Sequence, residues 1–201
     1  MTEVWRLWAA VLVVSGAGLL LAAGIALALA AGRIRHGVPR HTAWRHSIAE
    51  VGIVAGTLPW LWMIMTPNPG PSKIVTPLDG LRADFGHGAA NAVMQVGGNL
   101  LVFAAFGFLA PVRWRIRPLA VLAIAAVASA ILETSQYILD IGRIADFDDI
   151  ILNAAGAGLA ALCARRLSRR IDGNMTETGG PSIATHRYGE PSTQPIGSTD
   201  T

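Results

Sequence analysis

Charged residues are scarce in this chain: Asp, Glu, Lys and Arg make up 14% of its 201 residues, whereas hydrophobic residues make up 52%. Only one cysteine is present, Cys163, so a disulfide framework is excluded, and no CxxC or Cys/His cluster suggests zinc. Cys163 lies in an apolar run, where we expect it to be a small packing residue. There is no internal repeat and no phosphate-binding glycine loop. The net charge of +3 is weak evidence for nucleic acid, and we expect no nucleic-acid partner.

Apolar runs long enough to cross a bilayer dominate the chain, and the mean hydropathy is +0.46. The first run is too long for the hydrophobic part of a signal peptide, and its positive charge follows it, so we expect a retained span. The sequence therefore predicts an all-α integral membrane protein, multi-pass in the cell membrane. Five helices are expected, over about residues 5–31, 47–65, 92–112, 118–137 and 148–164.

Basic residues separate the predicted loops into two sets. Segments 33–46, 113–117 and 165–170 carry eleven Arg, whereas 66–91 and 138–147 carry three basic residues. Because cytoplasmic loops are enriched in Lys and Arg, we expect the N-terminus outside and the C-terminus in the cytoplasm. The Trp residues fall at the ends of runs or in short loops, as expected for rings at the membrane interface. They are Trp5, Trp8, Trp44, Trp60, Trp62 and Trp114.

The composition also predicts how the chain is divided. Residues 1–170 should form the transmembrane bundle, and residues 171–201, rich in Gly, Pro, Ser and Thr, a disordered cytoplasmic tail. Pro and Gly interrupt the outer loop 66–91, which we expect to be irregular. Gly52 and Gly56 form one GxxxG pair in the second helix, a weak signal for close helix packing.

Polar residues gather at the outer ends of the last three predicted helices. Asp149 and Asn153 are spaced i,i+4, and Glu133 and Gln136 i,i+3, so each pair lies on one helix face. An ionised side chain at the centre of a span costs about 2.5–3.5 kcal/mol. Glu133 should therefore face the bundle and hold a partner, for which Arg143, Gln136 and Asn99 are the candidates. The predicted cluster comprises Asn99, Glu133, Gln136, Arg143, Asp146, Asp149 and Asn153.

Two structural explanations compete with a functional site. Interhelical hydrogen bonds in membranes contribute about 0.6–2 kcal/mol each, so the cluster could serve only to hold the helices together. Acidic residues are also favoured at helix N-termini, which would account for Asp146 or Asp148 as a cap. The density of acids favours a site over either explanation. A divalent metal held by Asp146, Asp148 and Asp149 is a weaker alternative, and we expect no cofactor.

The same residues carry a family resemblance. The segments "NLLVFAAFGFLAP" from Asn99, "ETSQ" from Glu133 and "GRIADFDDIILNAAGAG" from Gly142 occur in series. In order, spacing and residue types the region of about residues 90–164 resembles the VanZ-like family of small bacterial membrane proteins. Many members carry Pro where this chain has Ala105. The resemblance implies little about activity, because the family's namesake is associated with teicoplanin resistance without an established reaction.

Three functions remain open from the sequence. We expect a non-enzymatic cell-envelope protein whose outer polar site binds or shields a cell-wall or lipid-linked ligand. Its partners would be the lipid bilayer and a lipid-linked cell-wall precursor or a glycopeptide. The alternative is a membrane enzyme acting on a lipid-linked substrate, with Glu133 and Asp149 as acid and base. A transporter or proton relay through Glu133 is less favoured, because the other spans show no matching series of charges.

Overall fold

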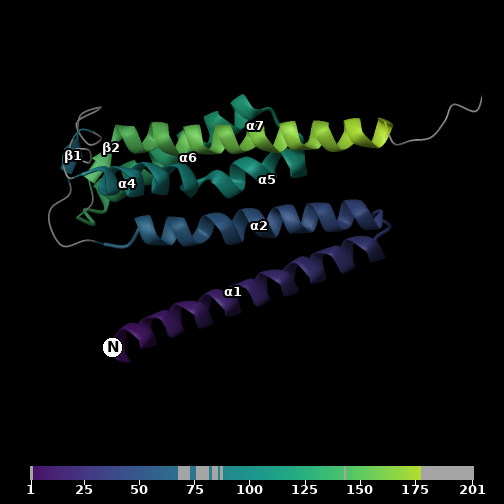
Figure 1. The fold of residues 1–201 in the computed structure, drawn as a ribbon, viewed down its shortest axis with the longest axis horizontal. Coiled ribbons are helices and arrows are strands. Elements are labelled where there is room, and N and C mark those ends of the chain that lie inside the picture. Colours follow the sequence, from purple (N-terminus) through teal and green to yellow (C-terminus); the bar gives the residue numbers. More distant parts are fainter. Residues whose placement is uncertain are drawn as a thin grey trace, which may run out of the picture.

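The computed structural model describes residues 2–67, 73–75, 82, 86, 88–142 and 144–177 (Figure 1). Its helices are long and roughly aligned, and the two short strands lie together at one end of the bundle (Figure 1). The helices are α1 (Thr2–Arg35), α2 (Arg40–Ile64), α4 (Ala89–Val102), α5 (Ala104–Trp114), α6 (Pro118–Ile138) and α7 (Phe147–Glu177). The strands are β1 (Lys73–Val75) and β2 (Ile144–Asp146).

The predicted all-α, multi-pass membrane fold is confirmed. In the described part of the chain, five helical segments are long and apolar enough to cross a membrane. They are Val13–Arg35, Arg40–Ile64, Ala89–Trp114, Pro118–Ile138 and Phe147–Arg170. Which side of the membrane each end faces remains a prediction from the arginine distribution.

Two helix ends differ from the predicted ones. The second helix begins at Arg40 rather than near residue 47, because Pro39 fixes the turn and the polar segment after it is helical. The last helix continues to Glu177, into the segment expected to be a tail. Residues 178–201 of that predicted tail lie outside the described residues.

The third span consists of two helices that meet at Phe103. This residue leaves helical geometry, with φ −108° and ψ 13°, and the chain continues as α5 in the same span. Helix α7 crosses here at very short range: a Cβ atom on Gly156 would lie within 3.0 Å of the Leu100 backbone, and one on Gly107 equally close to Ala157. The missing side chains of these glycines therefore allow the backbones of α7 and of the α4/α5 span to touch.

The GxxxG pair of α2 lies against α5. A Cβ atom on Gly52 would approach the Leu109 side chain at 2.7 Å, and Gly56 lies directly against the Cβ of Ala105. The predicted packing role of this pair is therefore confirmed. Helix α1 packs against α2 near the turn that joins them and diverges from it toward the N-terminus (Figure 1).

The β1/β2 pair was not expected, because the outer loop 66–91 was predicted to be irregular. The strands are parallel, with Ile74 opposite Ala145. Three residues of the loop therefore form backbone hydrogen bonds with the segment that leads into α7. This pairing holds part of the 66–91 loop beside the N-terminus of α7, where the predicted polar cluster lies.

Candidate binding site at the strand end of the bundle

A cavity of about 530 Å³ lies among α2, α4, α6 and α7, at the end of the bundle that carries the strands. Five of the seven residues of the predicted cluster line it. They are Asn99, Glu133, Gln136, Asp149 and Asn153, and the rest of the lining includes Trp60, Met63, Ile64, Met94, Gln95, Gly98, Val102 and Gly142. The cavity wall is therefore polar on the side of α6 and α7 and largely apolar on the side of α2.

Helix α7 contributes two of the polar side chains through its i,i+4 spacing. The Asn99 amide on α4 donates a hydrogen bond to the Asp149 carboxylate. One turn deeper, the amide nitrogen of Asn153 donates to the Ser129 hydroxyl on α6 at 2.8 Å, and this contact is fully buried. The two bonds fix α7 to both of its neighbours while leaving part of each side chain facing the cavity.

Glu133 is placed by the chain that enters α7. Its carboxylate accepts a hydrogen bond of 3.1 Å from the backbone N–H of Asp146, at the end of β2. The Asp146 carboxylate in turn accepts from the backbone N–H of Asp148 at 2.9 Å, which caps the N-terminus of α7. The capping explanation for Asp146 is therefore confirmed, and Asp146 does not line the cavity.

Helix α2 takes part in the site through its backbone and its aromatic residues, which the sequence did not indicate. The amide nitrogen of Gln136 donates to the carbonyl of Ile64 at 2.7 Å, which satisfies one of the free carbonyls at the end of α2. Trp60, one turn before that end, and Met63, next to Ile64, line the cavity. A backbone acceptor leaves no trace in the sequence, and Trp60 was predicted only as an interface residue.

The expected partners of Glu133 need a correction. Asn99 donates to the Asp149 carboxylate and Gln136 to the Ile64 carbonyl, not to Glu133. Each of these two amides bonds an acceptor on another helix, Asp149 of α7 or Ile64 of α2. Arg143, the predicted ionic partner, lies outside the described residues, so the Glu133–Arg143 pair remains a prediction.

The three aspartates of the alternative metal site have separate roles. Asp146 caps α7, Asp149 bonds Asn99, and Asp148 is buried, with 6% of its surface exposed. In the described part of the chain, no three His, Cys, Asp or Glu side chains are grouped as metal ligands. The geometry therefore gives no support to a metal bound jointly by Asp146, Asp148 and Asp149.

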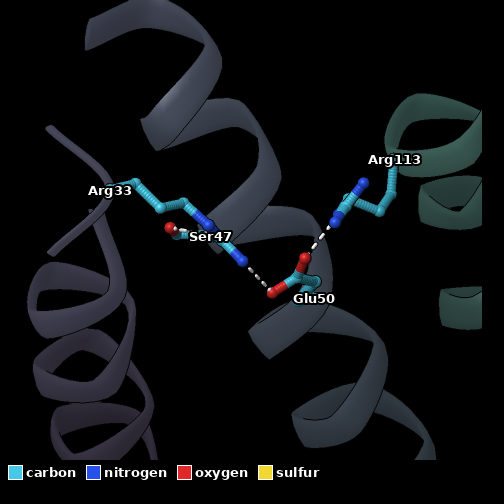
Figure 2. Close-up of polar contacts among 4 residues, drawn as sticks. All are labelled: Arg33, Ser47, Glu50 and Arg113. Atoms are coloured by element: carbon cyan, nitrogen blue, oxygen red, sulfur yellow. Dashed lines mark hydrogen bonds and ion pairs between the residues drawn. The ribbon is translucent and has the colours of Figure 1, made fainter. Parts of the chain in front are cut away.

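A second polar cluster, which the sequence analysis missed, joins α1, α2 and α5 toward the opposite end of the bundle. Figure 2 shows its contacts. The Glu50 carboxylate on α2 bonds Arg33 of α1 at 2.5 Å and also bonds Arg113 of α5. Arg33 additionally donates to the Ser47 hydroxyl at 2.6 Å. The signal available in the sequence was a lone acidic residue in an otherwise uncharged stretch of the second predicted helix.

Cys163 also differs from its prediction. Its side chain is exposed on α7 rather than packed between helices. The neighbouring small residues Ala161 and Ala164 occupy the packed face instead. In a membrane helix the exposed face contacts lipid, which suits a small, weakly polar thiol.

The comparisons with known proteins agree with this architecture. A family model described as VanZ/LLP1 matches residues 53–168, more than half of the chain. The match begins within α2 and thus includes the helix that supplies Trp60 and Ile64 to the cavity. Neither a curated protein nor a solved structure gives a significant match. With its five candidate spans and a match from α2 through most of α7, the chain belongs to the VanZ/LLP1 family.

Proposed function

We propose that the protein is a cell-envelope membrane protein that binds the polar head of an amphipathic, lipid-linked ligand in the cavity at the strand end. The observation that carries the proposal is the composition of the cavity wall. Glu133, Asp149 and Asn153 face a space of about 530 Å³ that is bounded on the other side by Trp60 and Met63. A cavity with a few placed polar groups among apolar ones is the usual form of a ligand site.

The polar groups of the wall favour a ligand rich in hydrogen-bond donors. Glu133 and Asp149 contribute carboxylate oxygens, which only accept. The carbonyl oxygen of Asn153 is buried and has no hydrogen-bond partner among the described residues, while its amide nitrogen is bonded to Ser129. A hydroxyl-rich sugar or an ammonium group would supply the matching donors.

The apolar side of the cavity favours a ligand that is also a lipid. Met63 and Met94 line the cavity and are 51% and 77% exposed, so they continue from its wall onto the surface of the bundle. Trp62, in the last turn of α2, is also exposed, with 79% of its surface accessible. Since the surface of a membrane bundle contacts lipid, a head group in the cavity could keep its hydrocarbon chain in the bilayer.

The test is to identify what the full-length protein retains. The protein is purified from its host membrane in a neutral detergent, and the co-purified small molecules are identified by mass spectrometry. Asp149→Asn removes a carboxylate of the cavity while keeping an acceptor for Asn99. Asp140→Asn, just beyond the end of α6, is the matched control. We expect wild type and the control to retain one donor-rich amphipathic species. Asp149→Asn should retain about one tenth as much of it, which corresponds to a loss of about 1.4 kcal/mol in binding free energy.

The proposal fails if wild type enriches no such species over an unrelated membrane protein purified in the same way. It also fails if both aspartate variants lose the species to the same extent. Glu133 and Asp149 both line the cavity, so the enzyme alternative has a candidate acid–base pair. Incubating the retained species with the protein separates the two: a binding protein leaves it intact, whereas an enzyme converts it and stops doing so in Glu133→Gln.

A further inference from the structure

A second cavity, at the end of the bundle opposite the candidate site, has a wall that suits a different ligand. It measures about 460 Å³ and lies among α2, the end of α5 with the turn that follows it, and the second half of α7. Four arginines line it together with apolar residues such as Pro111 and Ile116. These are Arg45, Arg115, Arg165 and Arg169.

In the described part of the chain up to Arg170, no carboxylate pairs with the four arginines of this cavity. Of the described residues up to Arg170, Glu50 is the carboxylate at this end of the bundle, and no ion pair or hydrogen bond joins it to any of the four arginines of the wall. Glu50 is already bonded to Arg33 and Arg113, neither of which lines the cavity. The four arginines of the wall are exposed, so a bound anion could meet several of them at once.

The position of the cavity relates it to the membrane. The span of α5 ends at Trp114, whose ring lies 5.5 Å from the Arg113 guanidinium, and the span of α7 ends at Arg170. Trp and Arg are typical of the interface between bilayer and water. Pro111 and Ile116 give the same wall an apolar part, next to which a hydrocarbon chain can lie.

We propose that this cavity binds the phosphate head group of an anionic phospholipid. Basic pockets between membrane helices are suited to such head groups. Membrane orientation alone requires arginines in the loops, but not that arginines from three separate segments meet around one cavity. The site differs in chemistry from the cavity at the strand end, because its wall offers guanidinium donors and the other wall offers carboxylate acceptors.

Helix α7 offers a matched pair of variants. Arg165→Gln with Arg169→Gln removes two arginines of the wall, whereas Arg166→Gln with Arg170→Gln removes two exposed arginines of the same helix that do not line it. Both double variants change the net charge by the same amount. Thermal unfolding of each double variant, compared with wild type, establishes that the fold is retained. Arg45→Gln provides a third variant, which removes a wall arginine from another helix.

Binding is measured by native mass spectrometry of the full chain, delipidated in neutral detergent and titrated with phosphatidylglycerol or phosphatidylcholine. We expect wild type to bind phosphatidylglycerol at least tenfold more tightly than phosphatidylcholine. The cavity variant, Arg165→Gln with Arg169→Gln, should bind phosphatidylglycerol about 25-fold more weakly, because each arginine near an anionic head group contributes a factor of about five to the affinity. The control variant should lose less than threefold, and Arg45→Gln about fivefold.

Four results would overturn the proposal. In the first, wild type binds both lipids equally. In the second, the two double variants lose the same affinity for phosphatidylglycerol, which would mean that only overall charge matters. Inorganic phosphate at millimolar concentration could displace phosphatidylglycerol completely, which would identify a site for free phosphate instead of a lipid. Retention of the lipid preference in the cavity variant would show that Arg165 and Arg169 do not bind the head group.

Discussion

Removing the carboxylate of Glu50 should destabilise the bundle more than any other single change of charge at the arginine end. Glu50 joins three helices, because its two oxygens bond Arg33 of α1 and Arg113 of α5 (Figure 2). Hydrogen bonds to charged groups contribute about 1.5–3 kcal/mol each, or about 3–6 kcal/mol for the two. Because the three side chains are 24–26% exposed, water can solvate the arginines once the carboxylate is gone, which offsets part of the lost bonding energy. We therefore expect Glu50→Gln to lower the free energy of unfolding by about 3 kcal/mol.

The measurement is thermal unfolding of the purified protein in detergent, followed by tryptophan fluorescence. The midpoint should fall by about 6–12 °C, because 1 kcal/mol corresponds to about 2–4 °C in a chain of this size. Arg33→Gln should also destabilise. Arg35→Gln, two residues further along α1 at an exposed position, should change the midpoint by no more than about 2 °C.

A double-mutant cycle tests whether the contacts themselves carry the effect. Glu50→Gln combined with Arg113→Gln should cost less than the two single changes added together, by at least about 1 kcal/mol. Strictly additive losses would show that the two residues do not interact. A loss below about 0.5 kcal/mol for Glu50→Gln alone would refute the estimate, because it would place the change among ordinary surface substitutions.

Three other predictions concern packing and orientation. Gly156→Ala should lower the yield of folded protein or reduce the free energy of unfolding by more than about 3 kcal/mol, because the new Cβ would meet the Leu100 backbone. In the same unfolding assay Gly97→Ala should be neutral or slightly stabilising, since no atom lies near its Cβ position. Cys163→Ala should leave the unfolding midpoint unchanged to within about 2 °C, since the thiol is exposed; a larger fall would indicate a packing role that its exposure does not explain. In that cysteine-free background, a membrane-impermeant thiol reagent should label Thr66→Cys in intact cells and His36→Cys only after permeabilisation, and the reverse pattern would contradict the predicted orientation.

The sequence by itself determined the membrane class, the number of spans and the family. The class and the number of spans depend on runs of apolar residues about as long as a bilayer is thick, because in a bilayer such a run satisfies its backbone hydrogen bonds only as a helix. The family depends on the three motifs that begin at Asn99, Glu133 and Gly142. The sequence also predicted which helix faces carry the polar groups. Asp149 and Asn153 lie one turn apart on α7, so their fixed i,i+4 spacing brings both to the same cavity.

The tertiary structure alone decided which polar groups meet. Asn99 could equally have bonded Glu133, but the glycines that let α7 touch α4 place Asp149 nearest to it. The packing of α6 against α2 likewise decides the partner of Gln136, which is the Ile64 carbonyl at the end of α2. The three-helix contact of Glu50 likewise joins residues 17 and 63 positions apart. A helix fixes only the neighbours within its own turns, whereas the pairing between helices depends on their crossing angles and separations, which small residues set in three dimensions.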